Sequence, residues 1–210
     1  MRLDPAGLPF IGGAVLLAVV LGVVVSWPLA VPFAALAALF TFFFRDPDRS
    51  PPPDAMVVLS PADGRVMFAG PAMPSAAPPG SWQQISIFLS PLDVHVNRIP
   101  ALGRVTKVSH TRGKFFPAYR DDAASANERS EIWIDHGGQA IVARQIVGIL
   151  ARRVVCRVQT GADVRAGDRF GVMKFGSRMD VFVPPTAEIT VQVGQMVRGG
   201  ETVIAVLHSS

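Results

Sequence analysis

No charged residue occurs within residues 10–44, and this long apolar run limits what the chain can fold into more than any other feature. One bilayer crossing needs roughly 20 apolar residues. Pro28 interrupts the run, so residues 10–27 and 29–44 fit two short crossings joined in a tight helical hairpin. One long tilted helix, broken at its prolines, is the alternative. We expect residues 1–44 to anchor the protein in a membrane.

A cleaved signal peptide is a second interpretation of the same segment. Arg2 would supply its basic start, but the run exceeds the roughly 7–15 residues of a typical signal-peptide core. Arg2 precedes the run, and Arg45 and Arg49 follow it. Because Lys and Arg are enriched at the cytoplasmic ends of membrane helices, the flanks favour a hairpin with both ends in the cytoplasm.

The chain is basic, with a formal charge of +4 and an isoelectric point near 10. Its Lys and Arg residues are scattered and form no cluster interleaved with aromatics, so we expect no nucleic-acid partner. An anionic membrane surface is the expected partner instead. The single cysteine, Cys156, permits no intrachain disulfide and suits a buried strand. The four histidines and this cysteine show no metal-ligand spacing, so we expect no metal.

Residues 45–54, "RDPDRSPPPD", are rich in proline and charge and are predicted to be a linker. Residues 55–210 consist mostly of short apolar segments separated by Gly, Pro and Asp turns. The expected strands include residues 56–60, 64–70, 84–90, 131–135, 152–158 and 179–184. Polar loops are expected at 72–81 and 118–130. The pattern predicts a mainly β domain, a sandwich or a barrel.

An internal repeat narrows the fold. Residues 164–172, "VRAGDRFGV", align with residues 197–206, "VRGGETVIAV", and place Gly167 on Gly200. The same turn occurs in lipoyl and biotinyl carrier domains, so we expect a barrel-sandwich-hybrid-like β domain. The repeat also supports a different function, a membrane-tethered carrier or adaptor module in which Lys174 would be the modified lysine.

Four stretches carry residues with chemical potential, and each alone has a purely structural interpretation. Asp63-Gly64 is a favoured hairpin turn pair. His95 lies in an alternating strand, and Gly176-Ser177 suits a turn. The stretches are "SPADGRV" at 60–66, "LSPLDVHVNRIP" at 89–100, "ANERSEI" at 126–132 and "KFGSRMDVF" at 174–182.

The Gly-Ser pair also permits a reaction of the chain with itself. The Ser177 hydroxyl can attack the carbonyl of Gly176, where the missing Cβ relieves crowding and allows unusual backbone angles. Such a step needs a base for the hydroxyl proton and donors for the oxyanion. β-Elimination of the resulting ester, followed by loss of ammonia, leaves a pyruvoyl group. This ketone forms a Schiff base with an amine and supports loss of CO2.

Together and in this order, "SPADG", "LSPLDVH", "NER" and "FGS" resemble the phosphatidylserine decarboxylases in their short prokaryotic form. The resemblance covers essentially the whole chain, including the membrane segment. It implies a pyruvoyl-dependent enzyme that converts phosphatidylserine to phosphatidylethanolamine and CO2 in phospholipid biosynthesis. The implied location is the cell membrane, at the cytoplasmic face of a prokaryotic inner membrane. A pyruvoyl enzyme acting on a soluble amino acid would have no need of the anchor.

The resemblance implies self-cleavage between Gly176 and Ser177. Residues 1–176 would form a larger β chain and residues 177–210 a small α chain. Ser177 would become the pyruvoyl cofactor at the head of the small chain. The two chains would remain together as a heterodimer, and a higher homo-oligomer stays open. Asp63 matches the acid of self-processing, which would orient a histidine beside Ser177. His95 matches the histidine of proton transfer.

The chain departs from the long forms of the family at two places. Those members have "LGST" at the cleavage site, where this chain has "FGSR" at 175–178. They also carry a second histidine three residues after the first, where this chain has Arg98. Either His95 serves both self-cleavage and decarboxylation, or His110 or His136 substitutes in one of them.

The candidate substrate-binding residues are Arg98, His110 and Lys114. The guanidinium of Arg98 suits phosphate oxygens, or it is solvated at a rim. Lys114 belongs to the loop 113–119, "GKFFPAY", which either dips into the lipid headgroups or packs its aromatics in the core. Asn127, in the "NER" motif, either binds substrate or braces the site.

Overall fold

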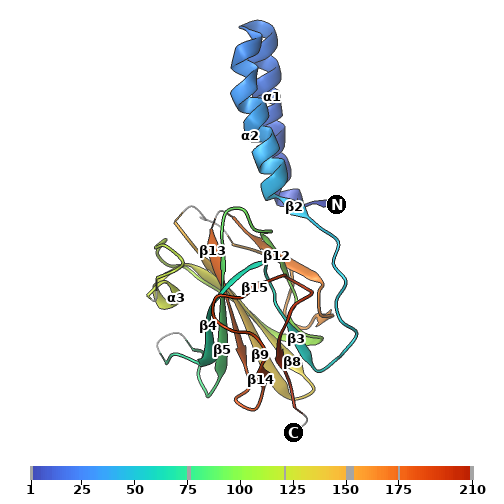
Figure 1. Ribbon diagram of the computed structural model, residues 1–210, viewed down its shortest axis with the longest axis vertical. Helices are drawn as coiled ribbons and strands as arrows, with labels where there is room; N and C mark the ends of the chain where they lie inside the picture. Colours follow the sequence, from blue (N-terminus) through green and yellow to red (C-terminus); the bar gives the residue numbers. More distant parts are fainter. Residues whose placement is uncertain (1, 75–76, 121, 150–153, 175, 209–210) are drawn as a thin grey trace. The chain divides into compact units, whose positions relative to one another are not determined.

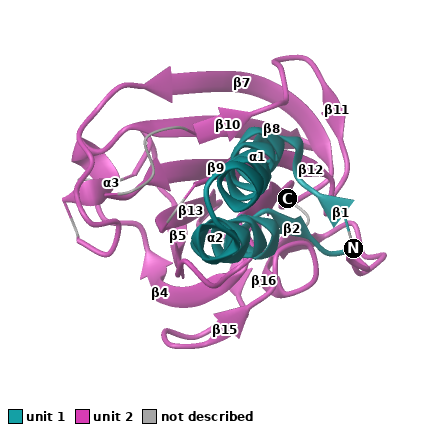
Figure 2. Ribbon diagram, turned by 90° about the horizontal axis from the view of Figure 1, so that it is seen from above, with its two compact units in different colours: residues 1–48 teal, residues 49–210 magenta. Residues whose placement is uncertain are grey.

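The computed structural model describes residues 2–74, 77–120, 122–149, 154–174 and 176–208. The chain divides into two compact units, Met1–Asp48 and Arg49–Ser210, coloured separately in Figure 2. All four motifs lie in the second unit. Phe175 of the cleavage motif, and residues 152–153 of one expected strand, lie outside the described residues.

The first unit consists of two apolar helices, α1 (Leu8–Val24) and α2 (Ala30–Phe43), connected through the 3-10 turn Trp27–Leu29 (Figure 1). Phe10 near the start of α1 contacts Phe40 near the end of α2, with ring centroids 5.6 Å apart, so the helices run antiparallel. The break between them falls at Pro28, whose nitrogen cannot donate a helical hydrogen bond. The apolar run therefore forms two helices rather than one.

Pro5–Val24 has 20 residues and a mean hydropathy of 2.4, so this helix is long and apolar enough to cross a membrane. Trp27–Phe43 is apolar but shorter. Below the helices, β1 (Arg2–Leu3) pairs with β2 (Arg45–Asp46), which joins the start of the unit to its end. Part of the expected linker is thus ordered as a short strand.

Among the described residues, eight antiparallel strands form the main sheet of the second unit, in the order β11-β7-β8-β9-β13-β5-β4-β15. The sheet curls as a half barrel, a curve visible in Figure 2, and the prediction of a mainly β domain is confirmed. The strands are β4 (Gly64–Pro71), β5 (Gln83–Leu89), β7 (Gly103–Thr111), β8 (Arg129–His136), β9 (Gln139–Val147), β11 (Asp163–Val164), β13 (Ser177–Val183) and β15 (Met196–Val197).

Two three-stranded sheets complete the described part of this unit, with orders β10-β12-β6 and β14-β16-β3. Their strands are β3 (Val57–Leu59), β6 (Val96–Arg98), β10 (Val154–Cys156), β12 (Arg169–Met173), β14 (Glu188–Ile189) and β16 (Val203–Val206). A short helix, α3 (Ala123–Ala126), lies within the expected loop 118–130.

The internal repeat has a structural counterpart. Its two copies begin with β11 and β15, the two opposite edges of the main sheet, and continue into β12 and β16 of the two small sheets. Gly167 and Gly200 turn the chain with φ of 86° and 77°, which favours glycine at both places. The two turns meet, since a Cβ added to Gly200 would lie 3.5 Å from the Cα of Gly167. The two copies are therefore equivalent units packed about a shared centre.

Strand β13 separates two environments because successive side chains of a strand point to opposite faces. Met179, Val181 and Val183 are fully buried in the hydrophobic core. Arg178 and Asp180 point to the other face, where they are buried as a charged pair. The strand that begins at Ser177 thus lies in the middle of the domain, between β5 and β9.

Candidate active site

Ser177 is the first residue of β13 and is held on both sides, by Leu89 of β5 and Val147 of β9. Its side chain is fully buried. Within the described part of the chain, its Oγ has no hydrogen-bond partner. Leaving a buried hydroxyl unsatisfied costs about 1–3 kcal/mol, so such a group calls for a functional explanation.

The residue before it, Gly176, lies in the left-handed region with φ of 72°. Its carbonyl oxygen rests directly against Gly148, at the end of β9, and a Cβ at position 148 would overlap this oxygen. Two glycines therefore shape the bond between residues 176 and 177, one by its conformation and one by making room. Gly148 was not among the sequence candidates, although a glycine just after a buried strand is a known sign of close backbone approach.

His95 is fully buried and lies beside this bond. Its Nδ1 is 2.9 Å from the carbonyl oxygen of Asp93, which can only accept, so Nδ1 carries the hydrogen. Nε2 is then the basic nitrogen, and the N–H of Gly176 donates to it at 3.4 Å. The arrangement places a lone pair of His95 at the backbone N–H of Gly176, the residue that precedes the bond predicted to be cleaved.

The other histidines make their described contacts elsewhere. His110 is half-exposed, with Nε2 3.6 Å from Glu128 Oε1. The Nδ1 of His136 bonds the Leu102 carbonyl at 2.9 Å. His208 is exposed and lies 3.9 Å from Glu188. Among the described contacts, only His95 reaches the Gly176-Ser177 segment.

Asp63 lies in a network with the linker and with the second repeat turn. Its Oδ1 accepts the Gly199 N–H at 2.7 Å, and its Oδ2 pairs with Arg49 at 2.7 Å. Arg49 also bonds Glu201 at 3.2 Å. Partial burial of Glu201 opposes its ionisation, but hydrogen bonds from the Ser50 N–H and Arg49 outweigh this and lower the pKa of Glu201. The network clamps the "SPADG" loop against the turn at 198–201.

Arg98 lies next to this clamp. Its side chain is 5% exposed, which rules out the solvated-rim alternative. Nη1 donates to the Gly167 carbonyl at 3.0 Å, and its backbone N–H donates to the Pro61 carbonyl at 2.8 Å. The segment that carries His95 is therefore fastened to the "SPADG" loop and to the first repeat turn.

Asn127 of the "NER" motif ties two backbone segments together. Its Oδ1 accepts the Phe116 N–H at 3.0 Å, and its Nδ2 donates to the carbonyls of Phe116 and Val147, each at 2.8 Å. Val147 is the partner of Ser177 in β9. Because both ends of its amide are engaged inside the protein, Asn127 braces the site. Lys114, in the braced loop, is exposed and lies 5.2 Å from the Phe116 ring.

The face of β13 opposite the core carries charges that no sequence pattern indicated. Arg178 donates to Asp180 at 2.6 Å and to the Ser86 hydroxyl at 3.1 Å, with both charged side chains buried. Across the strand, Arg144 donates to Glu131 at 2.7 Å. Burial lowers the pKa of Arg144, against the opposing effect of nearby Glu131 and Asp180.

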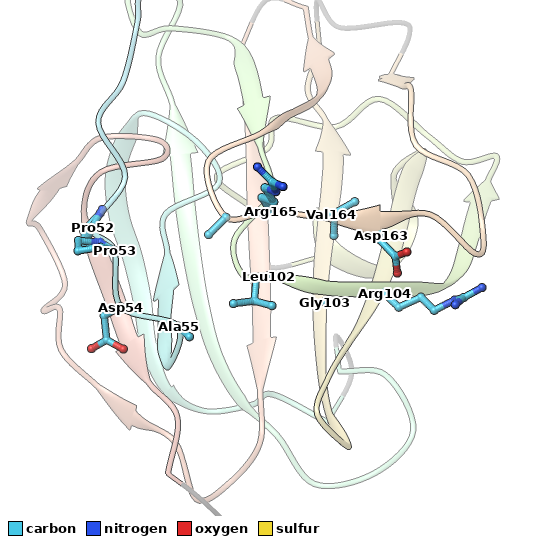
Figure 3. Close-up of a pocket in the computed structure, with 11 residues that line it drawn as sticks. Pro52, Pro53, Asp54, Ala55, Leu102, Gly103, Arg104, Asp163, Val164 and Arg165 are labelled. Atoms are coloured by element: carbon cyan, nitrogen blue, oxygen red, sulfur yellow. The ribbon is translucent and has the colours of Figure 1, made fainter.

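A cavity of about 360 Å³ adjoins the bond at Gly176. Apolar and aromatic groups dominate its lining, which comprises Phe88, Pro91, Pro117, Ala118, Tyr119, Gly148, Ile149 and Gly176. A larger cavity of about 870 Å³ lies between the linker and strands β7 and β11, and Figure 3 shows Leu102 between Asp54 on one side and Asp163 and Arg104 on the other. None of the four motifs contributes a described residue to the larger cavity. Lys174, the modified residue of the carrier alternative, is half-buried rather than displayed at an exposed turn.

Comparison with known proteins bears directly on this site. The model of the family described as phosphatidylserine decarboxylase matches residues 36–205, which include all four motifs. The phosphatidylserine decarboxylase proenzyme of Geobacter metallireducens is 40% identical over 207 residues, 96% of this chain and 94% of that protein. The proenzyme of Gluconobacter oxydans is 47% identical over 178 residues (82% and 79%), and that of Pelodictyon phaeoclathratiforme 44% over 171 (81% and 80%). The chain belongs to the phosphatidylserine decarboxylase family.

Proposed function

We propose that this protein decarboxylates phosphatidylserine to phosphatidylethanolamine and CO2, using a pyruvoyl group made from its own Ser177. The observation that carries the proposal is the environment of one peptide bond. The buried Ser177 hydroxyl has no described partner, Gly176 is in a left-handed conformation, and His95 Nε2 lies beside them. Membership of the family supports the substrate.

Self-cleavage starts when His95 Nε2 accepts the Ser177 hydroxyl proton and Oγ attacks the carbonyl carbon of Gly176. The peptide C–N bond breaks, the nitrogen of Ser177 takes up the proton, and an ester then joins the two parts. Loss of the Ser177 Cα proton and departure of the Gly176 carboxylate open the chain. Hydrolysis of the resulting dehydroalanine by water releases ammonia and leaves the pyruvoyl group.

The surroundings of Ser177 fit such a group. Its side chain occupies a buried position without a described partner, next to the apolar cavity of about 360 Å³. When formed, the ketone supplies an electrophile for the substrate amine and a sink for the electrons of the breaking Cα–carboxylate bond. The apolar lining excludes water and favours conversion of a carboxylate into neutral CO2. Once protonated, Nε2 of His95 would supply the proton for the substrate carbon, while the Asp93 carbonyl keeps the ring oriented.

Asp63 and Arg98 act as positioning residues in this scheme. Asp63 fastens the "SPADG" loop, and that loop binds the backbone of Arg98. Because His95 lies three residues before Arg98, the clamp fixes where its ring lies relative to Ser177. Arg98 stands where the long forms of the family have a second histidine, and its side chain bonds the Gly167 carbonyl. His95 would therefore serve both self-cleavage and decarboxylation.

The substrate reaches the site from a bilayer. The apolar helices of residues 1–44 support anchoring in a membrane, and the basic flanks favour the cytoplasmic face of the inner membrane. After cleavage, residues 1–176 and 177–210 stay together because β13 remains paired with β5 and β9. The product is a two-chain enzyme with its carbonyl group in the middle of the domain.

Intact mass and gel analysis of the purified protein test the proposal. We expect two chains separated before Ser177, a small chain that reacts with carbonyl reagents, and release of CO2 from phosphatidylserine vesicles but not from free serine. Ser177→Ala should give one uncleaved, inactive chain, whereas Ser109→Ala, at a half-buried position in β7, should cleave normally. His95→Ala should block cleavage, and His110→Ala should not. An intact chain carrying a modified Lys174 would instead support the carrier function.

A further inference from the structure

Three exposed side chains line the cavity at Gly176 or belong to the loop 113–119 that lines it, and we name them the mouth patch: Phe115, Tyr119 and Ile149. They are 38%, 62% and 56% exposed. Tyr119 and Ile149 line the cavity itself, and Phe115 lies two residues before Pro117, another lining residue. Single exposed apolar residues are ordinary, but a cluster at the entrance of a cavity marks an interaction surface.

The loop that carries Phe115 and Tyr119 is held firmly. The Lys114 N–H donates to the Ala126 carbonyl at 2.8 Å, and the Lys114 carbonyl accepts from the Glu128 N–H at 3.0 Å. The Asn127 side chain bonds both the N–H and the carbonyl of Phe116. The ring of Tyr119 packs against that of Phe88, with their centroids 6.4 Å apart. The exposed apolar side chains therefore belong to a loop whose backbone is fixed by hydrogen bonds.

Basic groups flank the patch. Arg112 and Lys114 are exposed, and the Lys114 ammonium lies 5.2 Å from the Phe116 ring. The Arg120 guanidinium lies 5.1 Å from the centroid of the same ring and pairs with the Asp122 carboxylate at 2.8 Å. Aromatic and aliphatic side chains flanked by Lys and Arg are typical of surfaces that enter the headgroup region of anionic membranes.

We propose that the mouth patch docks onto the anionic bilayer and delivers phospholipid headgroups to the cavity. The inference rests on the proposed function, and it adds a second membrane contact to the helical anchor. Small-molecule sites span about 300–1,000 Å³, and the cavity of about 360 Å³ is at the small end of that range. It holds a headgroup but not two acyl chains, so the chains must remain in lipid at the entrance. A bilayer is therefore the occupant that the mouth patch requires.

An environment-sensitive label on the full-length protein tests the docking. In a Cys156→Ser background, Phe115→Cys or Tyr119→Cys is labelled with NBD and the protein is reconstituted into phosphatidylserine-containing vesicles. Thr186→Cys is the matched control, because Thr186 is also exposed but follows the opposite end of β13 from Ser177. We expect the two mouth labels to shift to the blue and to lose most of their emission to doxyl-labelled lipids. The Thr186 label should do neither.

Each other outcome overturns the docking. Mouth labels that stay in water, or that respond no more than the Thr186 label, exclude membrane insertion. A blue shift without quenching by doxyl lipids would mean that another protein chain covers the mouth patch. Decarboxylation measured with the unlabelled parent protein on vesicles of the same composition separates the two proposals: parent activity without insertion of the labelled variants refutes only the docking, and insertion without parent activity refutes only the proposed function.

Discussion

At the scale of single residues, the site depends on backbone geometry as much as on side chains. The Gly176 carbonyl, whose carbon would be attacked in the proposed self-cleavage, lies directly against Gly148. His95 is oriented by a backbone carbonyl, that of Asp93, in the role a carboxylate plays in many catalytic triads. Both contacts involve main-chain atoms, so the residue types alone do not reveal them.

We expect Gly148→Ala to slow or abolish self-cleavage, because the added methyl group would displace the Gly176 carbonyl from Ser177. Overpacking of this kind also costs about 1–3 kcal/mol of stability. Gly171→Ala is the matched control for overpacking, since its Cβ would meet the Val155 carbonyl and Gln145 Nε2 rather than the Gly176 carbonyl. Gel analysis of chain cleavage together with thermal unfolding compares the two variants. Equal cleavage at equal loss of stability would show that Gly148 has no special role in maturation.

At the scale of elements, β13 combines two features, since its first residue is the proposed cleavage site and its face opposite the core carries a buried ion pair. Arg178 and Asp180 would become the second and fourth residues of the small chain after the proposed cleavage. Their pairing, together with the ladders to β5 and β9, holds the new chain end in place.

We expect Asp180→Asn to lower the free energy of unfolding by about 3–5 kcal/mol, because the Arg178 charge would be left buried without its partner. Urea unfolding monitored by circular dichroism measures the loss. Asp122→Asn breaks the exposed pair with Arg120 and should leave the unfolding curve unchanged. If both variants had the same free energy of unfolding, the buried pair would contribute no more to stability than the exposed one.

The turn at 198–201 should respond to acid. The lowered pKa of Glu201 means that its ionised form stabilises the folded state above the pKa of the unfolded chain. This stabilisation is lost as the pH falls through the lowered value. We therefore expect Glu201→Gln to be less stable than the parent at neutral pH and to lose less stability on acidification. Melting temperatures measured against pH test this, with the exposed Glu188→Gln as control; parallel curves for parent and Glu201→Gln would contradict it.

At the scale of the whole molecule, the proposed small chain, residues 177–210, contributes to two of the three sheets described in the second unit, all but the one formed by β10, β12 and β6. Its strands β13 and β15 lie in the main sheet, and β14 and β16 pair in the second small sheet. A chain woven into two sheets cannot leave without unfolding the domain.

We therefore expect residues 1–176 and 177–210 to co-elute in size-exclusion chromatography after complete cleavage. They should separate only at denaturant concentrations that also abolish the β-sheet circular dichroism signal. Release of the small chain from an otherwise folded protein would contradict the strand pairing. Arg169→Ala is the control, because it alters a sheet that contains no strand of residues 177–210. In this variant, too, the two chains should co-elute.

Several features of the fold were predictable because their signals are local. The apolar run and Pro28 indicated two helices, and the Gly-acid turns indicated the repeat whose copies form the two edges of the main sheet. Strand β9 was harder to interpret, because Arg144 and Gln145 interrupt its apolar pattern. Both are buried and bond to side chains on other strands: Arg144 donates to Glu131, and Gln145 donates through Nε2 to Asn97.

The sequence by itself determined the chemistry: the order of the four motifs, the Gly-Ser bond and the apolar segment are properties of residue type along the chain. Only the tertiary structure shows that His95 lies at the Gly176 N–H, that the Asn127 amide is engaged between Phe116 and Val147, and that Gly148 makes room for the Gly176 carbonyl. The physical reason is strand pairing. Residues distant along the chain meet through the register of β5, β9 and β13, and a register is set by packing of the whole sheet.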